Sequence, residues 1–241
     1  MNNKVNFLIF IPARAGSKGI KNKNMKMLGN LPLIGHTLEF SKKLSIADDI
    51  FISTDSDEVI EYCRNFDYKI DYIRPKDLAQ DTSNMVETLI DGIDWYEENN
   101  NKVVENIILL QPTSPIRSLE LINKAINQYL EMDCKSMISV SRMKESIFNC
   151  IEFQDNEKIK WKYIDPPLKK NHQRQELKNK TAHIDGNFYI FSNQFLRKNN
   201  SVISQEETVP YLIDSKYSID IDEEEDFIIA NLILQSLTNE S

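Results

Sequence analysis

The chain has 241 residues, a length that suits one α/β domain, and its 41% hydrophobic and 27% charged residues are close to those of an ordinary soluble protein. Its formal net charge of −8 argues against nucleic-acid binding, because an acidic surface repels a phosphate backbone. The sequence contains neither a membrane-spanning apolar run nor a secretory cleavage pattern, so we expect a cytoplasmic protein whose Cys63, Cys134 and Cys150 are reduced and buried.

Apolar runs of strand length alternate with helical patterns along the chain. The predicted strands cover 5–11, 50–54, 69–73, 107–111 and 137–140, the third and fifth having the weaker patterns. The predicted helices cover 32–44, 59–66, 85–96, 119–130 and 227–237. Asp55 and Glu58 resemble a capping pair ahead of the second helix. This alternation predicts a Rossmann-like, mostly parallel sheet sandwiched by helices.

The stretch 141–182 breaks this rhythm. It is polar and rich in lysine, yet it is too apolar to be disordered. Its apolar residues are Ile147, Phe148, Ile151, Phe153, Trp161, Tyr163 and Ile164. We expect 1–140 and 183–241 to form one α/β domain, and 141–182 to form an inserted β-rich arm that a homodimer partner exchanges.

The loop after the first predicted strand, IPARAGSKGIKNKN at 11–24, is basic in an otherwise acidic protein. Two glycines, Gly16 and Gly19, allow backbone N–H groups to approach an anion. The loop's cations are Arg14, Lys18, Lys21 and Lys23. Donors and fixed cations together suit a triphosphate, although a solvated basic loop is the alternative.

Asp220 and Asp222 alternate with Ile219 and Ile221 near the C-terminus. In an extended strand both acids share one face, where a hard cation relieves their mutual repulsion. The pattern therefore predicts a Mg²⁺ site, and the alternative is the acidic start of a helix.

Five segments, in the same order, resemble the bacterial CMP-sialic acid synthetases (acylneuraminate cytidylyltransferases), among them the CMP-legionaminic acid synthetases. They are IPARAGSKGIKNKN at 11–24, ISTDSDE at 52–58, IRPKDLAQDT at 73–82, LLQPTSPIR at 109–117 and SIDIDEEED at 218–226. The resemblance covers nearly the whole chain and is weakest over 141–182. It implies a nucleotidyltransferase in which the segment 141–182 is a dimerisation and sugar-binding arm.

The resemblance also implies roles for individual residues. The CTP phosphates and ribose would be held by Arg14, Ser17, Lys18, Lys23 and Asn24. Arg74 and the backbone near Ser83 would contact the cytosine. Gln111 and Thr113 would face the junction of nucleotide and sugar, and Asp220 and Asp222 would bind Mg²⁺. The residues expected to act in catalysis are Lys18, Arg14, Asp222 and Gln111.

The sugar side rests on weaker matches. Arg174, in HQRQEL at 172–177, is the candidate for the sugar carboxylate, with a surface arginine as the alternative. HIDGNFYIF at 183–191 resembles the following strand of the family, with Asp185 and Tyr189 toward the sugar. His183 and Asn149 depart from many relatives and leave the identity of the sugar open.

The predicted reaction joins CMP from CTP to an acidic nine-carbon sugar of the N-acetylneuraminate type, with release of pyrophosphate. Legionaminic acid is the main alternative substrate, ahead of pseudaminic acid and the eight-carbon octulosonate. A nucleotide-binding module without catalysis is the alternative of another class.

Overall fold

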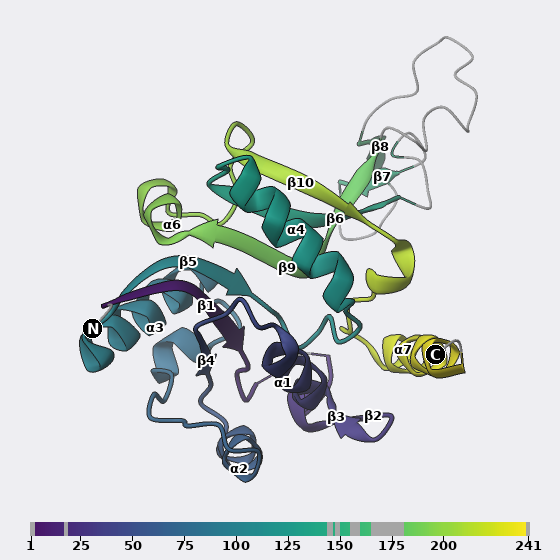
Figure 1. Ribbon diagram of the computed structural model, residues 1–241. Coiled ribbons are helices and arrows are strands. Elements are labelled where there is room, and N and C mark those ends of the chain that lie inside the picture. Colours follow the sequence, from purple (N-terminus) through teal and green to yellow (C-terminus); the bar gives the residue numbers. More distant parts are fainter. Residues whose placement is uncertain are drawn as a thin grey trace.

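A computed structural model describes residues 3–16, 19–143, 147, 150–154, 160–164 and 181–239. Its centre is a six-stranded sheet in the order β10-β6-β9-β5-β1-β4 (Figure 1). The strands are β1 (Lys4–Pro12), β4 (Asp49–Ser53), β5 (Val103–Leu109), β6 (Ser136–Arg142), β9 (Ala182–Ser192) and β10 (Thr208–Ile213). β1 is parallel to β4 and β5, and β6 is parallel to β10, whereas β9 runs antiparallel to β5 and β6. The expected mostly parallel sheet is thus confirmed.

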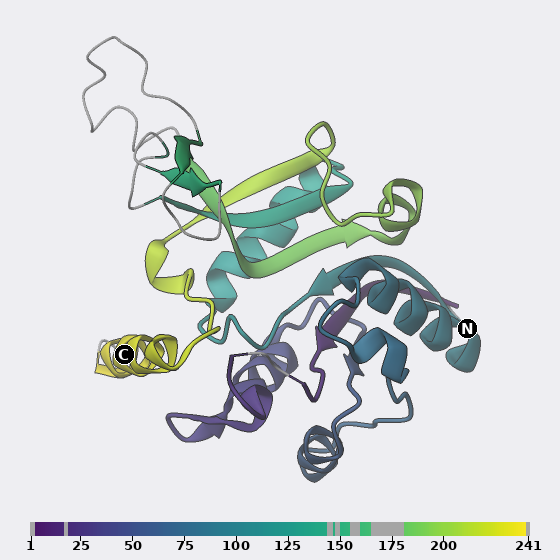
Figure 2. The same ribbon diagram turned by 180° about the vertical axis from the view of Figure 1, so that it is seen from behind.

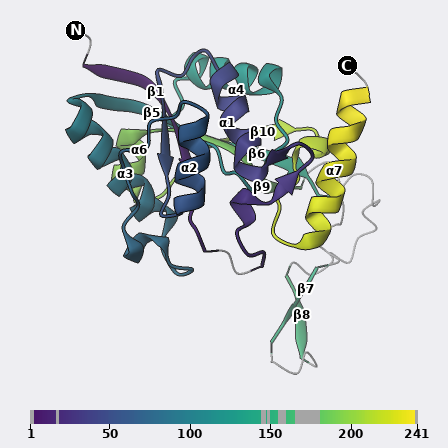
Figure 3. The same cartoon turned by 90° about the horizontal axis from the view of Figure 1, so that it is seen from below.

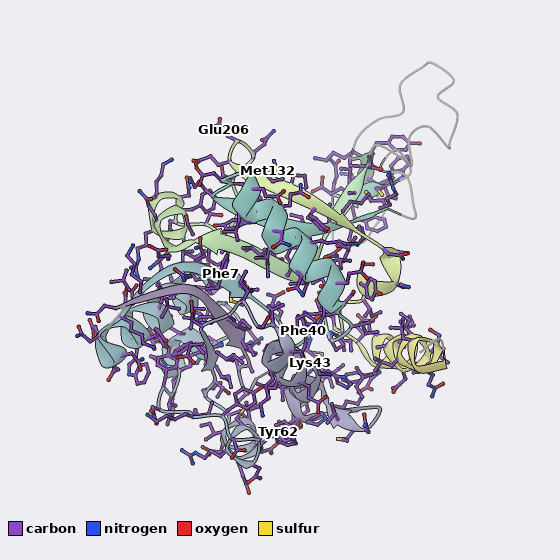
Figure 4. The ribbon with its side chains drawn as sticks, viewed as in Figure 1. Phe7, Phe40, Lys43, Tyr62, Met132 and Glu206 are labelled. Atoms are coloured by element: carbon purple, nitrogen blue, oxygen red, sulfur yellow. The ribbon has the colours of Figure 1, made fainter. Side chains whose placement is uncertain are left out.

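Helices cover both faces of the sheet, which explains why β1 is apolar on both sides. The helices are α1 (Leu33–Lys43), α2 (Asp57–Asn65), α3 (Met85–Asn100), α4 (Leu119–Glu131), α6 (Asn193–Asn199) and α7 (Glu224–Asn239). One core joins β1 to α1, α2 and α4, and includes Phe7 and Phe40, both labelled in Figure 4. The other core joins β1 to α3 and α6, and α3 lies toward the viewer in Figure 2.

Four helices begin at a capping side chain. Ser56, Asn84, Ser118 and Ser192 accept a backbone N–H at the start of α2, α3, α4 and α6. The expected Asp55–Glu58 capping pair is wrong, because Ser56 is the N-cap and its hydroxyl accepts the Val59 N–H.

A third apolar cluster brings the C-terminal segment back to the beginning of the chain. It joins α7 to the hairpin of β2 (Met27–Leu28) and β3 (Leu31–Pro32). Its buried residues are Ile20, Leu28, Leu33, Ile116, Ile221, Phe227 and Ala230. The segment that carries Asp220 and Asp222 is therefore packed against the segment that follows the basic loop.

The predicted strand at 69–73 is wrong. Ile70 and Tyr72 are buried between exposed neighbours, so the period of two is real. The segment is nevertheless not part of a ladder, and the backbone hydrogen bond that follows it runs from Arg74 N–H to the Thr54 carbonyl, 2.8 Å. It precedes the short 3-10 helix η2 (Lys76–Ala79).

Between β6 and β9 the structure describes a small hairpin of β7 (Ile151–Phe153) and β8 (Trp161–Tyr163). Figure 3 shows this hairpin projecting away from the sheet and its helices. All six residues of these strands are exposed.

No helix within the described ranges is long and apolar enough to cross a membrane. All three cysteines were expected to be buried, but only Cys63 is, while Cys134 and Cys150 are half-buried. Burial raises the pKa of the Cys63 thiol to about 12, which keeps it protonated and unreactive near neutral pH.

Candidate functional site

A recess of about 420 Å³ lies beyond the carboxyl ends of β1 and β5. Its lining residues are Pro12, Arg14, Gly16, Gly19, Lys23, Asn24, Arg74, Met85, Gln111, Pro112, Thr113, Asp222 and Glu223. A larger recess of about 750 Å³ follows the outer edge of β4. We place the site in the smaller recess, because only there do the basic loop and the C-terminal acids meet at strand ends.

The loop after β1 is fixed by neighbours at both of its ends. Ala15 N–H donates to the Asp55 carboxylate, 2.7 Å, and the Asn24 side-chain amide donates to the Arg14 carbonyl, 3.0 Å. Thr54, buried at the end of β4, donates its hydroxyl to the Ala13 carbonyl. The β4 end and the short helix η1 (Lys23–Met25) thus set the path of the loop.

Arg14 points its guanidinium along this loop and pairs with Asp81 at 2.6 Å. A side-chain carbon at Gly16 would lie 3.3 Å from its Nη1 atom, so the glycine leaves room for the guanidinium. Arg14 is therefore already oriented before any anion enters the recess.

The basic loop meets the C-terminal acids directly. Lys23 Nζ donates to the Asp222 carboxylate, 2.9 Å, and to the Ile221 carbonyl, 2.7 Å. A Cβ at Gly19 would lie only 2.5 Å from the Asp222 carbonyl oxygen, so a larger residue there would force the two segments apart. The two halves of the predicted nucleotide site therefore lie in contact.

Asp220 and Asp222 flank the buried Ile221, as the alternation predicts, but in a segment without a strand ladder. Ile221 N–H donates to the Thr113 carbonyl, 2.8 Å, and the Thr113 side chain hydrogen-bonds to Asp220. Desolvation raises the pKa of Asp220, the Thr113 hydrogen bond opposes that rise, and the charge on Asp222 adds to it.

Asp222 lines the recess and Asp220 does not, but both carboxylates are of the type that binds Mg²⁺ in proteins. Mg²⁺ commonly takes one or two protein carboxylates and completes its shell with phosphate oxygens and water. In the described parts of the chain, no group of three or more His, Cys, Asp or Glu is arranged as a metal site. The repulsion between Asp220 and Asp222 is the feature that a cation would relieve.

Of the two residues expected near the cytosine, Arg74 lines the recess and Ser83 does not. Arg74 lines the recess but is buried, and it donates to the Ser53 hydroxyl, 2.9 Å, and to the Ser53 carbonyl, 2.7 Å. Ser83 is not among the lining residues. Its hydroxyl accepts from Gln80 N–H and donates to the Asp77 carbonyl, so it shapes the turn before α3.

Asp185, one of the expected sugar residues, is next to Gly186, which lies against the Gln111 side chain. A Cβ at Gly186, whose φ is +75°, would lie 3.3 Å from the Gln111 Oε1 atom. The neighbouring Asp185 is buried, and its Oδ2 atom has no hydrogen-bond partner among the described residues. Burial, Asp220 and Asp185 all raise the pKa of Tyr189, which keeps its phenol protonated as a donor.

Ser17, Lys18 and Arg174 lie outside the described residues. The sequence did not predict the contacts that Asp55 makes with Ala15, Asp81 with Arg14, and Arg117 with the Gln111 carbonyl. Asp55 directly follows a predicted strand, and that position was the available signal for its role in holding the loop.

The chain is similar to known proteins of one family. Residues 8–235 match the model of the family described as Cytidylyltransferase. The chain is 32% identical over 231 residues to the CMP-N,N'-diacetyllegionaminic acid synthase of Legionella pneumophila, covering 95% of this chain and 96% of that protein. It is 30% identical over 226 residues to an N-acylneuraminate cytidylyltransferase of Streptococcus agalactiae, covering 92% of this chain and 51% of that protein.

Among solved structures, the fold resembles that of CMP:2-keto-3-deoxy-manno-octonic acid synthetase complexed with CTP. The TM-score is 0.66 at 12% identity, and the match covers 96% of this chain and 99% of that one. At this identity the likeness shows a shared fold.

Proposed function

Because the chain belongs to the cytidylyltransferase family, we propose that it transfers CMP from CTP to an acidic nine-carbon sugar and releases pyrophosphate. The observation that carries this proposal is the contact between the basic loop and the C-terminal acids, where Lys23 pairs with Asp222 inside one recess. A triphosphate needs cations on one side, and a metal-binding pair of acids suits the other.

In the proposed reaction the anomeric hydroxyl of the sugar attacks the α-phosphorus of CTP. A new P–O bond forms between the sugar oxygen and the α-phosphorus, the bond to the pyrophosphate oxygen breaks, and the hydroxyl proton passes to solvent water. Arg14 and Lys23, with Lys18 from the same loop, would hold and neutralise the phosphates. Gln111 and Thr113, at the end of β5, would orient the two substrates toward each other.

We further propose that Asp220 and Asp222 hold Mg²⁺. When bound, this ion would supply positive charge that stabilises the phosphates. Lys23 already shares the Asp222 carboxylate, so it would keep this acid aimed at the recess.

The first sugar to test is N-acetylneuraminate, and the second is N,N'-diacetyllegionaminate. The full-length similarity to the Legionella protein favours the second candidate. We also propose that the chain acts as a homodimer through the arm at 141–182, with the hairpin of β7 and β8 at the subunit contact.

Release of pyrophosphate from CTP with each of the two sugars tests the reaction, and ATP, GTP and UTP serve as controls. A catalyst releases pyrophosphate only with CTP and an acid sugar together. A non-catalytic nucleotide-binding module would bind CTP and release none, and this result would overturn the proposal.

The metal assignment has its own test in Asp222→Asn. We expect turnover to be abolished, because one of two metal carboxylates is lost, while CTP binding measured by calorimetry without metal persists. Binding of Mn²⁺ measured by paramagnetic relaxation should weaken in the same variant. Unchanged Mn²⁺ binding and normal pyrophosphate release would refute the assignment.

A further inference from the structure

Arg117 lies behind the recess and bridges three segments that are distant in sequence. It stands between β5 and α4, and the ring of Phe40 on α1 lies 5.9 Å from its guanidinium carbon. Among the described residues no carboxylate forms an ion pair with it. Desolvation lowers the pKa of Arg117 to about 9, and the charge on Asp220 partly opposes this, yet it remains a cation at neutral pH.

All three nitrogens of the guanidinium donate hydrogen bonds, each to a different acceptor. Nη2 donates to the Gln111 carbonyl, 2.6 Å, Nε donates to the Asn187 carbonyl, 3.0 Å, and Nη1 donates to the Thr37 hydroxyl, 2.9 Å. A planar fork fixes the relative positions of its acceptors, which a single ammonium cannot do.

Two of these acceptors belong to segments that touch each other at the site. Gln111 lines the recess, and its side chain lies against Gly186, in the part of β9 where the register with β6 shifts. This irregular segment is also held from within, because Asn187 N–H donates to the Asp185 carboxylate, 3.1 Å. The segment after β5 and the irregular part of β9 are thus held together from behind.

We propose that Arg117 is a positioning residue that sets the sugar side of the site by fixing Gln111 against the irregular Asp185–Asn187 segment of β9. The inference rests on the proposed function for its kinetic consequence, but the positioning itself is a property of the free chain. The nucleotide side is held by other contacts, since Asp55 and Asn24 fix the basic loop.

The kinetic test compares Arg117→Lys and Arg117→Met with wild type. We expect kcat/KM for the sugar to fall about 10- to 100-fold in both, because small displacements of reacting groups have effects of this size. The calorimetric Kd for CTP should stay within about twofold. A change of this size is too small to indicate that a contact with CTP has been lost. Thr37→Val, which removes only the acceptor on α1, is the matched control and should keep near-normal sugar kinetics.

A second readout does not need turnover. Hydrogen exchange should accelerate at the Ser114 and Asn187 amides in both Arg117 variants, because these amides bond within the two fixed segments. Exchange at the Ala15 amide should not change. If wild type releases no pyrophosphate, the proposed function is wrong. The hydrogen-exchange data still test whether Arg117 holds the two segments in place.

Three results would overturn the inference. They are unchanged exchange at both amides, wild-type sugar kinetics in Arg117→Lys, and a loss of CTP affinity that parallels the loss for the sugar. All measurements are made well below the Tm of the least stable variant, and Arg117→Lys carries the test if Arg117→Met does not fold.

Discussion

Arg14 is engaged with Asp81 in the free chain, so a triphosphate would have to compete for its guanidinium. Both side chains reach solvent, and exposed ion pairs contribute only about 0–1 kcal/mol. We therefore expect Asp81→Asn to tighten CTP binding, lowering the calorimetric Kd by up to about fivefold. Asp77→Asn, which removes an acid from the same segment and leaves the pair intact, is the control. Weaker CTP binding by Asp81→Asn would instead mean that Asp81 holds Arg14 in its working position.

The ionised Asp220 carboxylate is expected to lower the free energy of unfolding at neutral pH. Desolvation and Asp222 raise its pKa against the Thr113 hydrogen bond. The folded chain therefore binds this proton more readily than the unfolded chain, and stability falls as the pH rises from the ordinary aspartate pKa of about 3.9 toward the raised value.

It follows that Asp220→Asn should raise the Tm at neutral pH in buffer with a metal chelator, while turnover is lost. At about pH 3, where Asp220 is protonated in both states, wild type and variant should melt together. A lower Tm for the variant at neutral pH would show that the Thr113 hydrogen bond outweighs desolvation.

Individual residues of the site could be predicted by type and place but not by partner. Basic and acidic side chains after strands indicate a shared edge of the sheet, which is why Arg14, Gln111 and Asp222 line one recess. The pairs of Arg14 with Asp81 and of Ala15 with Asp55 depend on how separate loops fold over one another. No local pattern in the sequence encodes such pairs.

At the scale of elements, the three strong strands and the five helices were predictable because their apolar patterns are long and regular. β10 and α6 were not predicted, and the pattern at 69–73 predicted a strand that does not form. Burial on alternate positions produces the same period whether or not the backbone joins a ladder, so periodicity alone does not distinguish the two cases.

The segment that carries Asp220 and Asp222 depends on the packing of α7. Phe227 is buried in the third apolar cluster beside Ile221, and Lys26 lies over its ring at 4.7 Å. We expect Phe227→Ala to lower the free energy of unfolding by about 3–5 kcal/mol, as for other buried phenylalanines. Activity should fall further than this loss implies at temperatures where the variant is folded, because Asp222 is no longer held against Gly19.

Ile228 is the matched control for this prediction, since it is the next residue of α7 but is 63% exposed. Ile228→Ala should change the free energy of unfolding by less than about 0.5 kcal/mol. Denaturant unfolding measures both variants. Equal effects of the two substitutions would contradict the view that the cluster anchors the acidic segment.

At the scale of the whole molecule, the projecting hairpin exposes apolar side chains that nothing in the described chain covers. Phe153 and Trp161 face each other in register across β7 and β8, and they are 51% and 48% exposed. Exposed apolar groups of this kind mark association surfaces. We therefore expect wild type to sediment as a dimer and the double variant Phe153→Ser with Trp161→Ser to sediment as a monomer.

The same variant tests whether the site needs the second subunit. If a partner closes the sugar side, the specific activity of wild type should fall on dilution as dimers dissociate by mass action. The double variant should show a low specific activity that does not depend on concentration. Met27→Ser, which removes an exposed apolar side chain from the β2–β3 hairpin, should behave as wild type in both measurements. A double variant that still sediments as a dimer would place the subunit contact elsewhere, and full activity in a monomer would show that one chain completes its own site.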